Sequence, residues 1–230
     1  MGWGPQTHVQ RYDIHGTELL IGDVAGSIAA TWVANEMVLD EYGLNRIEFA
    51  PGDVVIDVGA HVGLFAIYLA KRHPEISVLA FEPEPINFHN MLANIAANSA
   101  VNVVPHHLAV TRDARPFTLE RPPGNSAAAS GYCGPRDGRA RATTASITLD
   151  RIFERFGIVR CKLLKVDCEG AEYEILRSTS ALDRVDWLSG EFHVSQSLRD
   201  RGCLAEELLD FVRARIPPER IAVKSNQIDD

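Results

Sequence analysis

Apolar residues in the first half of the chain follow first a strand pattern and then a helix pattern. The run DVVIDV at residues 53–58 is short, rich in β-branched residues and closed by Gly59, which is typical of a buried strand. Residues 61–72 then carry apolar side chains at helical spacing, and Pro74 ends that helix. The pattern therefore predicts a strand, a glycine-containing turn and a helix in succession.

The same alternation of strand and helix continues along the chain. Further strands are expected at residues 76–81, 101–110, 162–167, 187–192 and 221–224, and further helices from Pro85 onward and at 149–156, 171–177 and 204–214. Such alternation favours a mostly parallel sheet with helices on both faces. With right-handed crossovers, the expected fold class is α/β, Rossmann-like and doubly wound.

Two regions lack this alternation. Residues 1–50 precede the first strand of the expected sheet and are predicted to form a small N-terminal cap or lid. Residues 121–142 contain glycine, proline and serine throughout without a period, and so long a loop is usually functional or mobile. We therefore divide the chain into a cap at 1–50 and a ligand-binding domain at 51–230, with an inserted loop at 121–142.

The composition is that of a folded protein. The chain has 230 residues, of which 46% are hydrophobic, enough for one large domain or two small ones. Its 31 acidic and 23 basic residues give a net charge of -8, which argues against a broad nucleic-acid-binding surface. A local basic patch stays open, because five arginines flank or occupy the loop: Arg115, Arg121, Arg136, Arg139 and Arg141. They predict either an acidic or phosphorylated substrate or a solvated surface.

The cysteines and the first residues of the chain indicate a reducing compartment. The four cysteines form neither a C-x-x-C pair nor a Cys/His spacing suited to zinc. The first residues lack the pattern of a signal peptide, and no apolar stretch reaches the roughly 20 residues that a membrane-spanning helix needs. We therefore expect reduced thiols, a cytoplasmic location and no contact with membranes.

The turn after the strand at 53–58 carries the first candidate site, since ligands of open α/β sheets bind at the carboxyl ends of the strands. Its spacing, Gly59 to Gly63, is G-x-x-x-G, which lacks the middle glycine of a dinucleotide-binding turn and disfavours NAD. Asp57 precedes the turn, and Glu82 ends the next strand about 20 residues beyond Gly59, where a carboxylate can accept both hydroxyls of a ribose. These features fit S-adenosylmethionine, a nucleoside with a positive centre. Alternatively, the glycines only permit a tight turn and close packing.

Two later strands end in acidic residues and a histidine. Asp167 and Glu169 follow the strand at 162–167, while Glu191 and His193 end the strand at 187–192. In an extended chain, residues two positions apart point to the same side, so each pair should face the site together. Methylation of a hydroxyl is helped by a base, and Asp167, Glu169 and His193 are the catalytic candidates. A divalent metal would also suit such residues, but no full ligand set is visible, so no metal site is predicted.

These residues also have structural alternatives. Glu172, and Glu169 with it, could stabilise the N-terminus of the helix expected at 171–177. His193 could be a buried, hydrogen-bonded histidine with no part in catalysis. The sequence leaves these alternatives open.

Five blocks of sequence, in this order, resemble one family of enzymes. They are VVIDVGAHVGLFAIYLA, VLAFEPEPINFHNMLANIAAN, SITLDRIF, LLKVDCEGAEYEIL and the GEFH that ends at His193. Over about residues 36–193 the chain is similar to the FkbM family of S-adenosylmethionine-dependent methyltransferases. The resemblance implies the class I methyltransferase fold and an O-methyltransferase of polyketide or sugar hydroxyls in secondary metabolism.

The resemblance also implies roles for individual residues. It assigns to the cofactor Asp57, Gly59, Ala60, Gly63, Glu82, Pro83 and Asn87, to which we add His61, Ala109 and Asp167. Glu36 matches a glutamate that precedes the first strand in the family, and we expect it to reach the amino end of the cofactor. Asn125 and Ser126 match a pair in a loop that lies over the site, and they are the residues expected beside the substrate.

Two features depart from the family pattern. Cys168 stands where a small apolar residue is usual, and it should be tolerated if it packs inward. Class I sheets usually end in two antiparallel strands, and the segment after His193 is short for both. One of these strands is therefore expected to be short, displaced or absent.

The function predicted is S-adenosylmethionine-dependent O-methylation of a small molecule, with a homodimer left open. Three alternatives remain: N-methylation of a small molecule, a nucleic-acid methyltransferase or binding protein, and a non-catalytic protein that keeps the fold. Nucleic acid is disfavoured by the net charge and by the lack of the D/N-P-P-Y type of tetrapeptide that base methylation uses.

Overall fold

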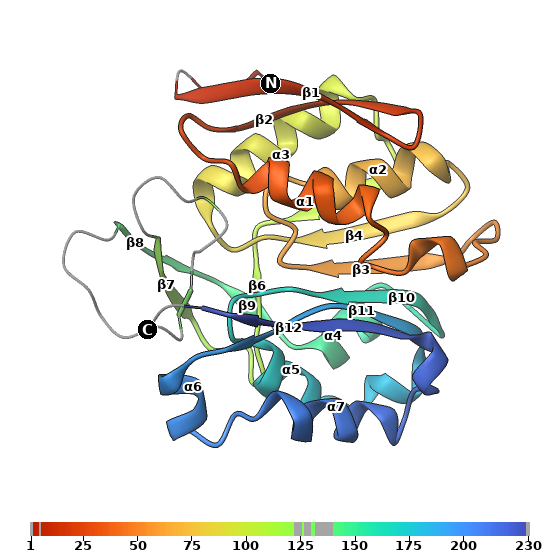
Figure 1. Ribbon diagram of the computed structural model, residues 1–230, viewed down its shortest axis with the longest axis vertical. Helices are drawn as coiled ribbons and strands as arrows, with labels where there is room; N and C mark the ends of the chain where they lie inside the picture. The colour runs from red at the N-terminus through yellow and green to blue at the C-terminus, as the bar shows by residue number, and fades with distance from the viewer. Residues whose placement is uncertain (1, 5, 122–125, 127–129, 132–139, 229–230) are drawn as a thin grey trace.

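The computed structural model describes residues 2–4, 6–121, 126, 130–131 and 140–228. Its centre is a six-stranded sheet in the order β12-β11-β10-β3-β4-β5, with every neighbouring pair parallel (Figure 1). The strands are β3 (Val54–Val58), β4 (Ser77–Phe81), β5 (Val103–His106), β10 (Cys161–Val166), β11 (Val185–Val194) and β12 (Ile221–Gln227). This order steps outward in both directions from the middle of the sheet, as in doubly wound Rossmann-like folds. The predicted fold class is confirmed.

Helices cover both faces of the sheet, and each face has its own apolar core (Figure 1). One face carries α1 (Ala29–Val38), α2 (Leu64–Arg72) and α3 (Pro85–Ala97), and the other carries α4 (Leu149–Arg155), α5 (Glu172–Ser178), α6 (Gln196–Asp200) and α7 (Ala205–Arg213). Neighbouring residues of β3 belong to different cores. Val55 packs into the core on the face of α1, α2 and α3, and Ile56 packs into the core on the opposite face. This follows from the period of two along a strand.

The N-terminal segment packs directly on the helices of the first face. It forms an antiparallel hairpin of β1 (Thr7–Ile14) and β2 (Thr17–Val24), followed by α1 and a short helix η1 (Leu44–Arg46). The side chain of Asn94 on α3 accepts a hydrogen bond from Gly22 N at 2.7 Å and donates one to Gly22 O at 3.0 Å. Residues of the hairpin and of α1 therefore share an apolar core with α2 and α3.

Several elements differ in extent from the sequence prediction. The strands β11 and β12 are longer than the expected 187–192 and 221–224, and two other differences alter the structure near the site. The strand expected at 101–110 is broken: β5 ends at His106, and β6 (Ala109–Val110) leaves the sheet to pair with β9 (Ser146–Ile147). The helix expected from residue 61 begins only at Leu64, because His61 and Gly63 adopt left-handed φ values of 52° and 83°. The glycine turn is therefore longer than its pattern suggests.

The last strand of the sheet is parallel to its neighbour. The chain leaves β11, passes through α6, α7 and the short helix η3 (Pro218–Arg220), and returns as β12. Such a helical crossover brings a strand back in the same direction. In the part of the chain that the structure describes, no antiparallel strand joins this sheet. The two antiparallel strands that usually end a class I sheet are therefore absent there.

The loop predicted at 121–142 is joined to the fold by a second hairpin. Its flanks form β7 (Phe117–Arg121) and β8 (Ala140–Thr144), which pair antiparallel. Within the loop, Ser130 exchanges two backbone hydrogen bonds with Glu120. Asn125 and most other loop residues lie outside the described residues.

Two features bear on the cellular setting of the chain. No helix in the described ranges is both long enough and apolar enough to pass through a bilayer. Cys161, Cys168 and Cys203 are free thiols, and Cys133 lies outside the described residues.

Candidate functional site

A cavity opens at the carboxyl ends of β3, β4 and β10, and most of the predicted site residues line it. Those of the predicted cofactor set are Gly59, Ala60, His61, Glu82, Pro83, Asn87, Ala109 and Asp167. Glu169, from the predicted catalytic set, lines the cavity as well, and so does Cys168, which also packs partly into the core below. The predicted site residues that the structure describes outside this lining are Glu36, Asp57, Gly63, Ser126 and His193.

Gly59 brings the two halves of the site into contact. Its φ is +81°, and a Cβ atom there would lie 1.8 Å from the carbonyl oxygen of Asp167. Gly63, also left-handed, starts α2, and a Cβ there would lie 2.8 Å from Met91 on α3. The first glycine is therefore needed for the approach of β3 to the end of β10, while the second serves helix packing.

Glu82 is a buried carboxylate at the end of β4. It is 5% exposed and accepts backbone hydrogen bonds from His61 N and Glu84 N, both at 2.8 Å. Burial raises its pKa to about 8, although these N–H donors oppose the rise. The carboxylate is held with both oxygens fixed, as a residue that recognises hydroxyl groups requires.

Ser126 anchors the inserted loop beside the glycine turn. Its hydroxyl lies 2.7 Å from Nε2 of His61 and 2.8 Å from the hydroxyl of Ser27, and its carbonyl accepts from Asn87 Nδ2 at 2.8 Å. Burial lowers the pKa of His61, which favours the neutral ring. The predicted loop residue Ser126 therefore touches two predicted cofactor residues, although it does not line the cavity itself.

Lys165 on β10 is a central residue that the sequence analysis missed. Its Nζ lies 3.1 Å from Oδ1 of Asp57, an ion pair whose angles are not those of a hydrogen bond, and 3.4 Å from Oδ2 of Asp167. It also donates to the carbonyl of Gly59 at 3.1 Å. Burial raises the pKa of Asp57, against the attraction of Lys165, while both carboxylates outweigh burial and raise the pKa of Lys165. Asp57 therefore fixes Lys165, which itself lines the cavity.

His193 lies at the centre of an acidic group formed by the carboxylates of Asp167, Glu169, Glu172 and Glu191. Its Nδ1 lies 2.9 Å from Oε1 of Glu172, and its Nε2 lies 3.6–3.8 Å from carboxylate oxygens of Asp167, Glu169 and Glu191. Burial lowers the pKa of His193, but the carboxylates, Glu172 above all, outweigh it and raise the pKa to about 10. Burial raises the pKa of Glu169 to about 7 against the attraction of His193.

The pairs Asp167/Glu169 and Glu191/His193 lie together as predicted, but only the second pair does so along an extended strand. Glu191 and His193 both belong to β11 and point the same way, as the period of two requires. Asp167 follows β10, and Glu169 has a left-handed φ of 54°, so this pair converges through a turn and not along an extended strand. Glu172, at the start of α5, accepts from Cys168 N at 2.9 Å and thereby holds that turn.

Glu36 lies away from the cavity, in contact with β12. Its carboxylate lies 2.8 Å from Nζ of Lys224 and accepts from the hydroxyl of Tyr42 at 2.7 Å. Lys224, a second residue that the sequence analysis missed, also contacts Glu191 at 2.8 Å and pairs with Glu41. Glu36 is therefore linked to the acidic group through a lysine.

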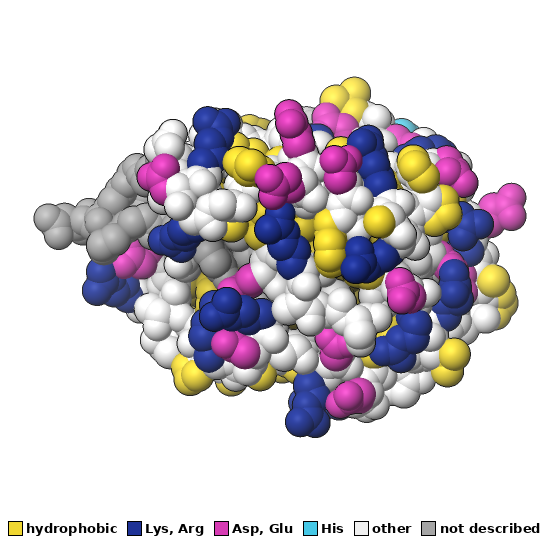
Figure 2. All heavy atoms as spheres, turned by 90° about the horizontal axis from the view of Figure 1, so that it is seen from below, with side chains coloured by type: hydrophobic (Ala, Val, Ile, Leu, Met, Phe, Trp, Pro, Cys, Tyr) yellow, Lys and Arg dark blue, Asp and Glu magenta, His cyan; other side chains and the backbone are white. Residues whose placement is uncertain are grey.

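The arginines around the loop are paired with carboxylates where the structure describes them. Arg115 contacts Asp113 and Glu174, each at 3.0 Å or less, and Arg141 contacts Glu120 at 2.7 Å. Arg121 lies 3.4 Å from Glu84, while Arg136 and Arg139 lie outside the described residues. On the face that carries α5, α6 and α7, basic and acidic side chains are likewise intermingled (Figure 2).

Comparison with known proteins identifies the family of this chain. The model of the methyltransferase FkbM domain matches residues 57–216, from Asp57 at the glycine turn to beyond β11. Methyltransferase 1 of Beauveria bassiana is 26% identical over 184 residues, which cover 71% of each chain. The 31-O-demethyl-FK506 methyltransferase FkbM of Streptomyces tacrolimicus is 41% identical over 66 residues, 28% of this chain and 25% of that protein.

Solved structures include more distant neighbours. The precorrin-6y C5,15-methyltransferase of Geobacter metallireducens superposes with a TM-score of 0.42 at 13% identity, covering 74% of this chain and 67% of that one. The parallel sheet, its strand order and the family match together confirm the class I methyltransferase fold. The matched region holds both the glycine turn and the acidic group, and the chain belongs to the FkbM family of methyltransferases.

Proposed function

We propose that this protein methylates a hydroxyl group of a small molecule with S-adenosylmethionine as the methyl donor. One observation carries the proposal: the same cavity is lined by Glu82, suited to a ribose, and by Asp167 and Glu169, suited to an acceptor hydroxyl. The name of the FkbM protein of Streptomyces tacrolimicus, which refers to a 31-O-demethyl compound, supports methylation at oxygen.

The residues of the cavity fit this cofactor. Glu82 presents a buried carboxylate to the two ribose hydroxyls, and Oδ1 of Asn87 is buried without a hydrogen-bond partner among the described residues. The turn at Gly59 lets the main chain of residues 58–61 form the cavity wall. When bound, S-adenosylmethionine supplies a methyl group on a positively charged sulfur, and the carboxylates nearby favour that charge.

The acceptor would contact the part of the cavity wall that contains Asp167 and Glu169. Asp167 and Glu169 line it, whereas His193 lies behind them. A carboxylate at this place would hold the acceptor hydroxyl and take its proton as the oxygen bonds to the methyl carbon and the bond from that carbon to sulfur breaks. Such general bases contribute about 10² to 10⁴-fold. His193 then acts as a positioning residue, because it contacts both carboxylates without reaching the cavity.

A two-part experiment tests the proposal. Calorimetry with S-adenosylhomocysteine should show one site per chain, and Glu82→Ala should weaken binding more than about tenfold, since hydrogen bonds to a charged group contribute about 1.5–3 kcal/mol. Glu75→Ala is the matched control, because Glu75 is a partly exposed carboxylate at the opposite end of β4.

The second part identifies the product. The protein is incubated with S-adenosylmethionine and a panel of hydroxylated and aminated small molecules, and products are analysed by mass spectrometry and NMR. Methyl groups on oxygen support the proposal. Methyl groups on nitrogen, or a protein that binds no S-adenosylhomocysteine, would overturn it.

A further inference from the structure

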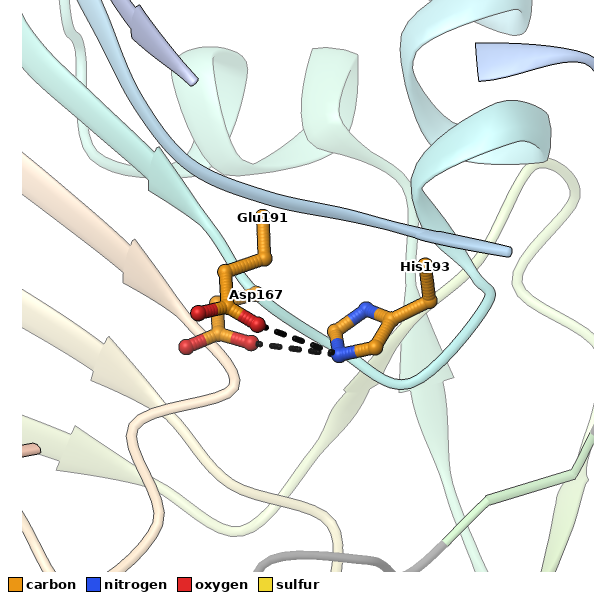
Figure 3. A group of neighbouring side chains, drawn as sticks. All are labelled: Asp167, Glu191 and His193. Atoms are coloured by element: carbon orange, nitrogen blue, oxygen red, sulfur yellow. Dashed lines mark ion pairs between the residues drawn. The ribbon is translucent and has the colours of Figure 1, made fainter. Parts of the chain in front are cut away.

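Three carboxylates surround one nitrogen of a buried histidine. Nε2 of His193 lies 3.8 Å from Oδ1 of Asp167, 3.7 Å from Oε1 of Glu169 and 3.6 Å from Oε2 of Glu191. Figure 3 shows Asp167 and Glu191 directed at this nitrogen. Hydrogen bonds between such atoms would be about 2.7–3.2 Å long, so these contacts are too long. Ligands that share one cation at about 2.0–2.4 Å lie about 3–4 Å apart, which is the spacing between Nε2 and each carboxylate oxygen.

The histidine is oriented as a metal ligand would be. Glu172 holds its Nδ1 at 2.9 Å, which turns Nε2 toward the carboxylates. A carboxylate on the second ring nitrogen commonly fixes the ring of a metal-binding histidine. The side chain is 1% exposed, and within the described part of the chain its Nε2 makes no hydrogen bond. This nitrogen therefore points into the acidic group, where its contacts with described residues are the three long ion pairs.

Two of the three carboxylates, those of Asp167 and Glu191, are also held from behind. Oδ2 of Asp167 lies 3.4 Å from Lys165, which leaves Oδ1 to face His193. Glu191 receives Lys224 on Oε1 at 2.8 Å and the amide of Asn226 on Oε2 at 2.7 Å. Since each carboxylate oxygen has two lone pairs, Oε2 keeps one for a further contact. One donor atom from each of Asp167, Glu191 and His193 lies within 4.8 Å of the others.

We propose that Asp167, Glu191 and His193 bind a divalent metal ion, and that this ion coordinates the acceptor hydroxyl. The second half of this proposal rests on the proposed function. Asp167 lines the cavity whereas Glu191 and His193 lie behind it, so an ion held by all three would reach the acceptor on the side of Asp167. Two carboxylates and one imidazole form an oxygen-rich donor set of the kind that suits Mn²⁺. The ion would weaken the O–H bond of the coordinated hydroxyl, and the proton would pass to Glu169, which is outside the three-ligand set.

The test measures metal binding alone, without methyl donor or acceptor. Mn²⁺ is titrated into chelator-treated protein, and the free ion is measured by its electron paramagnetic resonance signal. We expect one Mn²⁺ per chain, and losses of affinity of more than about tenfold in Asp167→Asn and in Glu191→Gln. Glu41→Gln is the matched control, because Glu41 pairs with Lys224 but does not approach His193.

A spectroscopic measurement separates ligation from a change in folding. Spin-echo spectra of the bound Mn²⁺ should carry the modulation of an imidazole nitrogen in the natural protein. His193→Gln should lose this modulation, and Asp167→Asn, in which the altered side chain is partly exposed, should keep its circular dichroism spectrum. Retention of the nitrogen signal in His193→Gln would contradict the proposal.

Two further outcomes separate the metal site from the proposed function. If the natural protein binds no Mn²⁺, or if Asp167→Asn and Glu191→Gln bind it equally well, a proton on His193 is the occupant of the acidic group and the metal proposal is wrong. S-adenosylhomocysteine binding is measured independently. Its absence beside intact Mn²⁺ binding would contradict the proposed function and leave the metal site standing.

Discussion

Glu172 at the start of α5 and His193 on β11 form a buried pair, with Oε1 of the glutamate 2.9 Å from Nδ1 of the histidine and neither side chain more than 1% exposed. The same carboxylate accepts from the backbone N–H groups of Cys168 and Gly170, at 2.9 and 3.1 Å. One side chain therefore holds both the turn after β10 and the histidine of the next strand.

Glu172→Ala should lower the free energy of unfolding by about 3–5 kcal/mol, because it leaves a buried charged partner and two N–H groups without acceptors. Urea denaturation at neutral pH measures this. Glu174→Ala on the same helix is the control, since its carboxylate pairs with the more exposed Arg115 and should matter by about 1 kcal/mol or less. Equal decreases in the free energy of unfolding of the two variants would show that the buried pair stabilises the protein no more than the exposed one.

Gly59→Ala should destabilise the protein far more than Gly52→Ala. Both glycines are left-handed, at +81° and +88°, but a Cβ at Gly52 meets none of the described atoms within 4 Å. Gly52→Ala should therefore cost only the conformational term of about 1–2 kcal/mol. At Gly59 the new atom would lie 1.8 Å from the backbone of Asp167, so thermal unfolding should occur at a much lower temperature or no folded protein should form. Similar unfolding temperatures would mean that β10 moves aside easily.

Lys165→Met should destabilise the protein by about 3–5 kcal/mol, because Asp57 is then buried without a countercharge. Adding Asp57→Asn should recover part of the loss, which a double-mutant cycle in urea denaturation would measure. Lys162→Met on the same strand is the control, since Lys162 lies 3.9 Å from Asp53 and both are partly exposed. Additive effects of the Lys165 and Asp57 changes would contradict the predicted coupling.

The affinity for S-adenosylhomocysteine should rise with pH. The pKa of Glu82 is about 8 in the free protein, and the ionised carboxylate is the form that accepts two ribose hydroxyls. Binding below that pH must therefore release a proton, which weakens affinity by up to about tenfold for each pH unit. Calorimetry between pH 6.5 and 8.5 checks this. Glu82→Gln should bind more weakly and without this slope, and a flat profile in the natural protein would exclude the role of ionised Glu82.

The succession of the six strands of the main sheet, and of most helices between them, follows from local patterns and was predictable. The β-branched runs place β3, β4 and β10 within about one residue of their observed bounds, because a buried strand needs apolar side chains on both faces. The extent of the third strand was not predictable from the same pattern. The end of β5 depends on the pairing of β6 with β9, and β9 lies far along the chain.

The site residues at the ends of strands were predictable from the sequence, whereas the ion pairs between neighbouring strands were not. Asp167, Glu169 and His193 could be found because parallel strands end at one edge of the sheet. Lys165 and Lys224 were missed, since their partners Asp57 and Glu191 lie on neighbouring strands whose register no local pattern gives. A lysine within an otherwise apolar strand is nevertheless a signal that could have identified Lys165.

Lys224 also sets an order of events during synthesis. It belongs to β12, the last of the six strands, and it contacts Glu36 on α1 and Glu191 on β11. A nascent chain can form its glycine turn well before β12 is made, but Glu191 acquires its lysine only after β12 has left the ribosome. The acidic group around His193 is therefore completed only when β12 joins the sheet, and this step also brings α1 into contact with that strand.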